Sequence, residues 1–190
     1  MAILLFLGNP GKQYLKTRHN IGWNICHAVV AELSESPAWK SKFHADYCET
    51  FELSSGKSVL CKPQTFMNKS GLTAREVLSF YKAGSEDLIV IHDDLETPFG
   101  TVTFQQGGGL GGHNGLKSIK AELGNADFFR LKIGIGRPQR GSVSSHVLGR
   151  FSPDEEISLS YIINLATDLL RASMKQSPMT QKKISKSINL

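Results

Sequence analysis

The sequence predicts an α/β fold: a single domain, residues 1–190, whose helices flank a mixed, mostly parallel, twisted sheet. Two short apolar runs, ILLFL at 3–7 and DLIVIH at 87–92, are typical of strands that are buried on both faces. Segments with helical spacing and an alternating hairpin pattern lie between these runs. Strands that alternate with helices along the chain are typical of an α/β fold.

The N-terminal run is the first expected element. No basic residue precedes its apolar stretch, and Gly8-Asn9-Pro10-Gly11 ends it, so we interpret it as a buried strand and not as a signal sequence. The other elements expected before residue 150 are helices at 21–33, 72–82 and 116–123, a hairpin of strands at 43–53 and 58–62, and strands at 87–92, 101–105 and 130–135.

The last helix has the clearest start. Ser152 supplies an N-cap, Pro153 fits the first helical position, and Glu155 completes a capping box. We expect this helix to run to about Met174. The tail that follows, at about 175–190, is rich in Ser, Lys and Gln, and we expect it to be basic and frayed or partly helical.

Composition and cysteine usage limit the class of protein. Hydrophobic residues make up 40% and charged residues 21%, as in an ordinary globular domain. No apolar run approaches the roughly 18 residues that a membrane span needs. The cysteines Cys26, Cys48 and Cys61 form no CxxC pair, which argues against a disulfide framework or a zinc site. We expect reduced thiols in a cytoplasmic protein.

The net charge of +5 is unevenly distributed along the chain. Residues 117–150 hold seven basic residues against two acidic ones, and residues 171–190 hold five basic and no acidic residues. Residues 71–116 lean acidic instead. Such an uneven distribution of charge suits a protein that holds a polyanion with one face, although a solvated basic surface would give the same pattern.

Polar side chains gather directly beyond the predicted strand ends. In an open α/β sheet the loops at the carboxyl ends of parallel strands converge on one crevice, so these side chains should meet there. They are Asn9, His19, Asn20, Asn68, Asp93, His113 and Asn114.

The chemistry of such a crevice follows by elimination. The sequence has no G-x-S-x-G elbow for a serine nucleophile, and no cysteine lies in these loops. The remaining nucleophile is water, which a histidine can activate as a general base near neutral pH. Asp93 could fix the tautomer of His19 and stabilise its imidazolium, while asparagine amides could donate to a developing oxyanion.

Each of these residues also has a structural interpretation. A lone histidine in a loop, such as His19, is more often structural than catalytic. Asp93 or Asp94 could cap the loop after its strand, Asn9 fits ordinary turn chemistry, and Asn68 could be an N-cap.

The glycine-rich loop GGGLGGHNG has a further interpretation. Gly107, Gly109 and Gly112 formally satisfy G-x-G-x-x-G, but Lys132 stands where a dinucleotide site requires an acid. Five glycines among six residues favour a mobile loop or a close approach of backbone to a substrate.

At these residues the chain closely resembles the bacterial-type peptidyl-tRNA hydrolase family. Six stretches match in family order: LGNPGKQYLKTRHNIG, KPQTFMNKSG, DLIVIHDDLETPFG, GGGLGGHNGLKSI, FFRLKIGIGRP and VLGRFSPDE. One such motif could arise by chance, but six in order effectively cannot.

The resemblance implies one α/β domain, usually monomeric, that needs no obligate protein partner, metal or cofactor. A metal centre of His92, Asp93 and His113 has no support from their spacing either. The implied substrate is peptidyl-tRNA, held by its 3′ end and acceptor stem. The implied bond is the ester between the peptide, or an N-blocked amino acid, and the 3′-terminal ribose. Its hydrolysis recycles tRNA from prematurely released peptidyl-tRNA.

The resemblance also implies roles for single residues. His19 matches the general base, Asp93 the carboxylate that supports it, and Asn9 the residue linked to distinguishing blocked from free amino termini. The positions expected to bind substrate or tRNA are Tyr14, Phe66, Met67, Asn68, His113, Asn114, Arg130 and Lys132. Because an ester is an easier target than an amide, bound water and one His–Asp pair suffice without a covalent intermediate.

The chain departs from the family pattern where tRNA would be held. Thr103 and Gln105 lie in a strand that often carries lysines in the family. We therefore expect the grip on phosphates to shift toward Arg130, Lys132 and Arg140.

Two other functions stay open on the sequence alone. The first is a catalytically silent RNA-binding relative of the same fold; the joint presence of Asn9, His19, Asn68, Asp93 and Asn114 argues against it. The second is a nucleotide-dependent enzyme built on the glycine loop. It predicts thermal stabilisation by NAD or ATP, which we do not expect.

Overall fold

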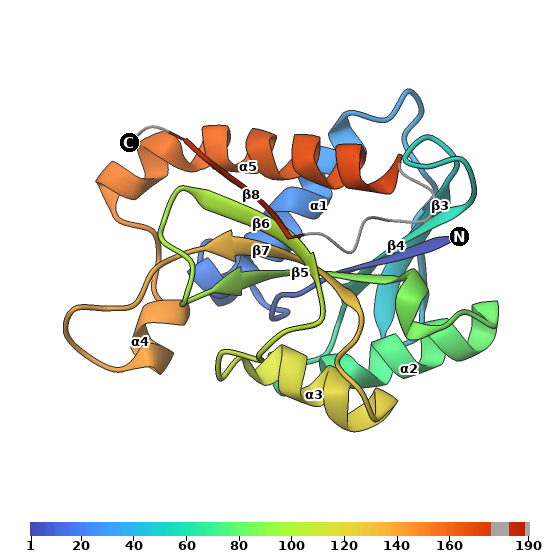
Figure 1. Cartoon of the computed structure of the whole chain (residues 1–190), viewed down its shortest axis with the longest axis horizontal. Coiled ribbons are helices and arrows are strands. Elements are labelled where there is room, and N and C mark those ends of the chain that lie inside the picture. Colours follow the sequence, from blue (N-terminus) through green and yellow to red (C-terminus); the bar gives the residue numbers. More distant parts are fainter. Residues whose placement is uncertain (176–182, 189–190) are drawn as a thin grey trace.

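A computed structural model describes residues 1–175 and 183–188, which fold around one eight-stranded sheet (Figure 1). The strands are β1 (Ala2–Phe6), β2 (Lys40–Lys42), β3 (Ala45–Thr50), β4 (Ser58–Pro63), β5 (Leu88–Asp94), β6 (Thr101–Gln106), β7 (Phe129–Gly134) and β8 (Ile184–Ser187). The α-helices are α1 (Ile21–Ala31), α2 (Ser70–Tyr81), α3 (Asn114–Leu123), α4 (Val143–Val147) and α5 (Pro153–Met174). Short 3₁₀ helices are η1 (Lys12–Tyr14), η2 (Arg18–Asn20), η3 (Met67–Lys69) and η4 (Ser85–Asp87).

The sheet has the order β2-β3-β4-β1-β5-β7-β6-β8. The β4–β1, β1–β5 and β5–β7 pairings at its centre are parallel. The other four pairings between described strands are antiparallel. The predicted α/β fold with a mixed sheet is confirmed, but the expectation that the sheet is mostly parallel is wrong. Two antiparallel pairings tip the balance, because the polar strands β2 and β8 lack the apolar pattern that marks a strand in a sequence.

Helices cover both faces of the sheet: α1 and α5 lie on one face, and α2 and α3 on the other (Figure 1). Alternate side chains of β1 enter the two cores, with Leu4 and Phe6 in the first and Ile3 and Leu5 in the second. A strand that is buried on both faces must be apolar throughout, and every residue of β1 is buried. The interpretation of the N-terminal run as a buried strand is therefore confirmed.

Helix α5 begins and ends as predicted. The side chain of Ser152 accepts the N–H of Glu155, whose carboxylate accepts the N–H of Ser152 at 2.7 Å. Pro153 is the first helical residue. Among the helices of the described residues, none combines the length and the apolar character that a membrane span requires.

The C-terminal segment corrects the expectation of a frayed or partly helical tail. Strand β8 pairs antiparallel with β6, and its Ser185 and Ser187 hydroxyls lie 2.8 and 2.9 Å from those of Thr103 and Thr101. Without β8, β6 would present unpaired backbone groups at the sheet edge, which even a polar segment can satisfy. Of the tail expected at about 175–190, residues 176–182 and 189–190 lie outside the described residues.

A close approach between α1 and the sheet fixes the position of η2, which directly precedes this helix. A Cβ atom at Gly22 would collide with the carbonyl oxygens of Leu7 and Ile91. Because these oxygens belong to the sheet backbone, they cannot move aside as a flexible side chain can. Glycine at this position therefore lets the start of α1 lie directly against the backbone of Leu7 and Ile91 at the centre of the sheet.

We expect Gly22→Ala to lower the free energy of unfolding by about 1–3 kcal/mol, because the added methyl group overpacks a rigid contact. Urea unfolding followed by circular dichroism measures the change. The matched control is Gly56→Ala, since a Cβ at that position would meet no atom within 4 Å. Equal stabilities of the two variants would show that α1 can move away from the sheet without loss.

Candidate active site

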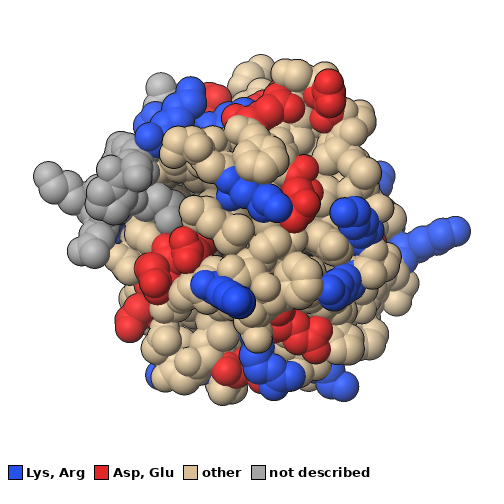
Figure 2. All heavy atoms as spheres, turned by 90° about the vertical axis from the view of Figure 1, so that its right-hand side faces the viewer, with Lys and Arg blue, Asp and Glu red and all other residues tan. Residues whose placement is uncertain are grey.

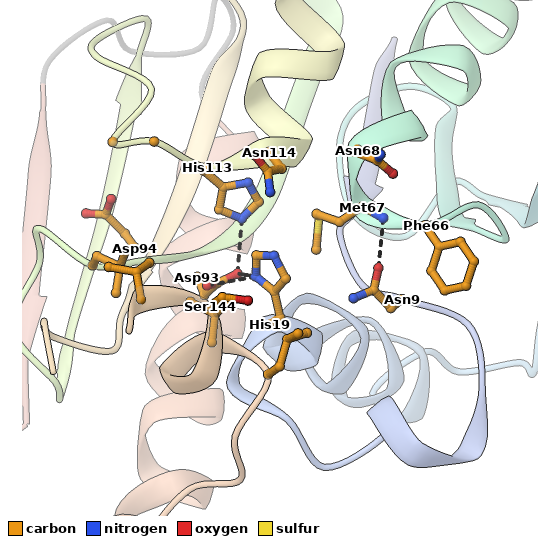
Figure 3. A pocket seen from close by; sticks show the side chains of 16 residues that line it. Asn9, His19, Phe66, Met67, Asn68, Asp93, Asp94, His113, Asn114 and Ser144 are labelled. Atoms are coloured by element: carbon orange, nitrogen blue, oxygen red, sulfur yellow. Dashed lines mark hydrogen bonds and ion pairs between the residues drawn. The ribbon is translucent and has the colours of Figure 1, made fainter. Parts of the chain in front are cut away.

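A pocket of about 300 Å³ opens at the carboxyl ends of β1 and β5 (Figure 3). The three residues predicted to be catalytic, Asn9, His19 and Asp93, all line it. Five residues predicted to bind substrate line it as well: Phe66, Met67, Asn68, His113 and Asn114. The convergence expected from the strand ends therefore exists in the structure.

The His19 and Asp93 side chains form a buried pair. Nδ1 of His19 lies 2.8 and 3.0 Å from the two carboxylate oxygens of Asp93. With Nδ1–H donating to the carboxylate, Nε2 keeps its lone pair. Figure 3 shows this second ring nitrogen facing the pocket. The pair thus has the geometry in which a carboxylate fixes the tautomer of a histidine base.

Arg18 anchors the 3₁₀ helix η2 that carries His19. Its guanidinium donates to the carbonyl oxygen of Arg150 at 2.6 Å and forms an ion pair with Glu155. The backbone N–H of Arg18 donates to the carbonyl oxygen of Gly149 at 3.0 Å. These bonds fasten the histidine to the start of α5, whose own capping box uses the same glutamate.

Asp93 is fully buried, yet it remains an anion. Burial pulls the pKa of its carboxyl upward, but the positive charge of a protonated His19 and the hydrogen bonds from His19 and His113 outweigh burial and hold this pKa well below its usual range. Nε2 of His113 lies 3.1 Å from Oδ1 of Asp93. The carboxylate therefore has a partner on two different elements (Figure 3).

The neighbours of Asp93 on β5 have separate partners. Burial lowers the pKa of His92 to about 3, and its Nδ1–H donates to the carbonyl oxygen of Asp93 at 2.7 Å. Asp94 accepts the Thr97 hydroxyl and lies 2.9 Å from Nζ of Lys132. Asp94 also lines the pocket, but its carboxylate is engaged by Thr97 and Lys132, whereas that of Asp93 is bonded to the two histidines.

Asn9 has a side-chain orientation that its hydrogen bonds define. Its Oδ1 accepts the N–H of Met67 at 2.7 Å, and its backbone exchanges two 2.9 Å bonds with the side chain of Asn20. Because the oxygen is engaged with η3, the amide NH₂ group is the end that faces the pocket (Figure 3). Asn9 therefore offers a donor next to His19.

The remaining predicted binding residues surround the mouth of the pocket. Asn68 in η3 and Asn114 at the start of α3 are exposed, and so is Phe66. Tyr14 does not line the pocket itself, but its ring meets that of Phe66 edge-on, with centroids 6.2 Å apart. These two aromatic rings form a rim outside the buried histidine.

The side chains of Arg130 and Lys132 are too buried for a phosphate to reach them directly. Arg130 is fully buried, and its guanidinium donates to carbonyl oxygens of Gly108, Gly109 and Ala126 at 2.7–3.1 Å. The expectation that Arg130 grips phosphate is therefore wrong in this structure, because the glycine loop covers it. Lys132 is mostly buried in its ion pair with Asp94.

One wall of the pocket was not predicted. It comes from α4 and the residue after it: Val143, Ser144, Val147 and Leu148, with Leu95 beside them. Val143 and Leu148 are 41% and 42% exposed. The wall consists mainly of apolar side chains, which carry no chemical signal in a sequence, so only the exposure seen in the structure reveals it.

The histidines and Asp93 fit a hydrogen-bonded carboxylate better than a metal centre. Ligand atoms of His19, Asp93 and His113 lie within 4.8 Å of one another. However, Nδ1 of His113 accepts the N–H groups of Gly115 and Leu116, so its proton sits on Nε2, where a metal would need a lone pair.

The glycine loop also lacks the context of a dinucleotide site. It follows β6, which pairs antiparallel with β7, whereas the fingerprint requires a parallel βαβ unit. The dinucleotide interpretation of this loop is therefore excluded.

Fold and site together define a class of protein: a protein with a mixed α/β sheet whose histidine–aspartate pair faces a pocket lined by amides. The family described as "Peptidyl-tRNA hydrolase" matches residues 3–189. The chain belongs to this peptidyl-tRNA hydrolase family, as its sequence motifs imply.

Relatives with this name cover most of the chain. Peptidyl-tRNA hydrolase of Geotalea daltonii is 46% identical over 170 residues, which are 90% of this chain and 88% of the relative. That of Halalkalibacterium halodurans is 42% identical, with 93% and 95% of the two chains covered. The crystal structure of peptidyl-tRNA hydrolase from Acinetobacter baumannii superimposes with a TM-score of 0.84 at 31% identity, over 95% of this chain and 93% of that one.

The lowered pKa of Asp93 gives a testable pH dependence of stability. A carboxylate whose pKa falls on folding stabilises the protein above its unfolded pKa of about 3.9, and this contribution is lost as the pH falls below that value. The free energy of unfolding should therefore decrease more steeply for the wild type than for Asp93→Asn between about pH 4 and pH 2. Urea unfolding at a series of pH values tests this, and parallel profiles would contradict it.

Proposed function

We propose that this protein is an esterase that cuts the bond between a peptide, or an N-blocked amino acid, and the 3′-terminal ribose of tRNA. The observation that carries the proposal is the His19–Asp93 pair, whose second histidine nitrogen faces a pocket lined by uncharged amides. Family membership and the names of the relatives support the choice of substrate. The cell would thereby recover tRNA from prematurely released peptidyl-tRNA.

In the proposed mechanism, Nε2 of His19 takes a proton from a water molecule as the water oxygen bonds to the ester carbonyl carbon. The carbonyl oxygen becomes an oxyanion, for which Asn9, Asn68, Asn114 and the backbone amides of the glycine loop are the available donors. As the carbon–ribose oxygen bond breaks, the imidazolium returns the proton to the ribose oxygen. Asp93 stabilises the imidazolium in between.

The surroundings of the pair suit the two halves of this substrate. The apolar α4 wall with Leu95 offers a surface for peptide side chains without specific polar contacts. On the other side, the exposed ring of Phe66 and the neighbouring Tyr14 can stack with the unpaired bases of the 3′ end. Asn68, beside Met67, and Asn114, beside His113, add amide groups to the pocket lining (Figure 3).

The acceptor stem requires basic groups near the pocket. Arg130 is buried and Lys132 is paired, so we assign this role to Lys117 and Lys120, which are exposed on α3 and in no ion pair with a described residue. Helix α3 starts at the pocket residue Asn114. The face at the amino-terminal end of β1, by contrast, mixes basic and acidic side chains (Figure 2).

We further propose that the protein acts as a monomer, without an obligate protein partner, in the cytoplasm. All three cysteines are buried free thiols, and burial raises the pKa of Cys48 to about 11. Such unreactive thiols suit a reducing compartment. Light scattering of the purified protein tests the monomer.

A turnover assay with N-acetyl-aminoacyl-tRNA tests the proposed activity and separates it from a catalytically silent RNA-binding relative. We expect the wild type to release the amino acid and His19→Ala to lose this activity while remaining folded. Asp93→Asn should lose about 10⁴-fold in kcat, by analogy with tautomer loss in a catalytic triad.

The control variant is His27→Ala, because His27 is an exposed histidine of α1 that does not line the pocket. It should turn over at the wild-type rate. Binding of the substrate by the wild type without release, or near-normal turnover by His19→Ala, would contradict the proposed mechanism.

The role of Lys117 predicts a change in salt dependence. Each phosphate contact contributes about 0.7–0.9 to the slope of log KM against log salt concentration. Lys117→Ala should reduce this slope by about that amount. Lys40→Ala is the control, since Lys40 lies in the edge strand β2 far along the sheet order from the pocket. An unchanged slope for Lys117→Ala would exclude a phosphate contact at this residue.

A further inference from the structure

His113 lines the pocket, but its side chain has no ring nitrogen left for a substrate. The side chain is 7% exposed. Nδ1 accepts the backbone N–H groups of Gly115 and Leu116 at 3.1 and 3.4 Å, which makes His113 the N-cap of α3. Nε2 is bonded to Asp93 at 3.1 Å. The substrate-binding role expected from the sequence therefore does not explain the position of this residue.

The hydrogen bonds fix the tautomer of the His113 ring. Backbone N–H groups can only donate, so Nδ1 must hold a lone pair, and the proton of the neutral ring is on Nε2. A proton on Nδ1 would point at two other N–H groups and would place positive charge at the amino-terminal end of a helix, where the helix dipole opposes it. The Nε2–H group is thus directed at the Asp93 carboxylate.

We infer that His113 is a positioning residue that acts through Asp93: it holds the carboxylate in the place where the carboxylate orients His19. The inference rests on the proposed esterase function. His19 and His113 face Asp93 from η2 and from the cap of α3. On its own strand Asp93 has His92 and Asp94 as neighbours. Of these groups, only the two that face Asp93 from other elements donate to its carboxylate oxygens.

The second N–H donor affects both the orientation of the Asp93 carboxylate and the negative charge that it offers to His19. The second donor restricts rotation of the Asp93 side chain, so the Nδ1 bond of His19 keeps one direction. It also takes up part of the negative charge that would otherwise stabilise the imidazolium of His19. Loss of the His113 bond should therefore slow the chemical step and also favour the protonated form of His19, which cannot act as a base.

The variant that tests this inference is His113→Asn, with His113→Ala for comparison. Asparagine is a good N-cap, so it can replace the cap of α3, but its side chain is too short to reach Asp93 as well. Alanine removes both interactions. The two variants therefore separate a role in capping from a role in positioning.

We expect both variants to lose about 10- to 100-fold in kcat for N-acetyl-aminoacyl-tRNA, the rate equivalent of a hydrogen bond to a charged group. KM should stay close to the wild-type value, since no substrate contact is removed. The acidic limb of the pH–kcat profile should move to higher pH. His113→Asn should melt about 2–4 °C above His113→Ala, because it keeps the cap.

A direct readout of the tautomer comes from ¹⁵N spectra of the imidazole rings of the wild type. They should show the proton of His113 on Nε2 at neutral pH. A proton on Nδ1 would contradict the hydrogen-bond assignment on which the inference depends.

The kinetic results distinguish a positioning role of His113 from a helix cap and from substrate binding. Wild-type kcat in His113→Asn would reduce His113 to a helix cap, and a raised KM with unchanged kcat would assign it to substrate binding; both results overturn the inference. An acidic limb that does not move would show that His113 does not act through Asp93. Absence of hydrolysis by the wild type would refute the proposed esterase itself, whereas an active wild type with unaffected variants refutes the positioning role alone.

Discussion

The carboxylate of Asp93 is buried at the end of β5, and its charge must be compensated there by groups from elsewhere in the chain. An unpaired buried carboxylate is strongly destabilising, so the fold has to bring donors to it. They come from His19, which lies 74 residues earlier, and from His113, which lies 20 residues later. The parallel β1–β5 pairing places the first donor and the docking of α3 places the second. Stability and the arrangement of the site therefore depend on the same charge.

Three consecutive polar residues at the end of β5 would be expected to interfere with one another, yet each has its own partners. Burial keeps His92 neutral, as its pKa of about 3 indicates. The charge of Asp94 is balanced by Lys132 on the neighbouring strand β7. Neither group therefore competes with His19 for the Asp93 carboxylate. This separation lets a strand end carry two adjacent carboxylates in one pocket, of which only Asp93 is bonded to His19 and His113.

Sequence patterns predicted those parts of the structure that depend on local chemistry. The buried strands β1 and β5 have apolar runs because both faces are covered, and polar residues after parallel strands converge because the strand ends do. Strands β2 and β8 were missed because polar segments that add to an edge have no apolar pattern. For Arg130, the alternation of β7 gives the face of the sheet but not what covers that face. The covering segment is a glycine loop without side chains, so its path leaves no periodic trace in the sequence.

Hydrogen bonds hold the glycine loop at both of its ends. Arg130 holds the carbonyl oxygens of Gly108 and Gly109, and the loop ends at His113, which joins it to Asp93. Between these points Gly111 and Gly112 have positive φ angles of 55° and 76°, which side-chain-bearing residues rarely adopt.

The pocket thereby gains a wall of backbone opposite the amides of Asn68 in η3 and of Asn9, which follows β1. For the proposed substrate this is a consistent solution, because the peptide varies in sequence while the ester, the ribose and the peptide backbone are constant. Uncharged amides recognise the constant polar groups, and an apolar wall tolerates the variable side chains. Among the described residues, Asp93 is the carboxylate that is bonded to His19, and the inferred role of His113 is to hold it in that position.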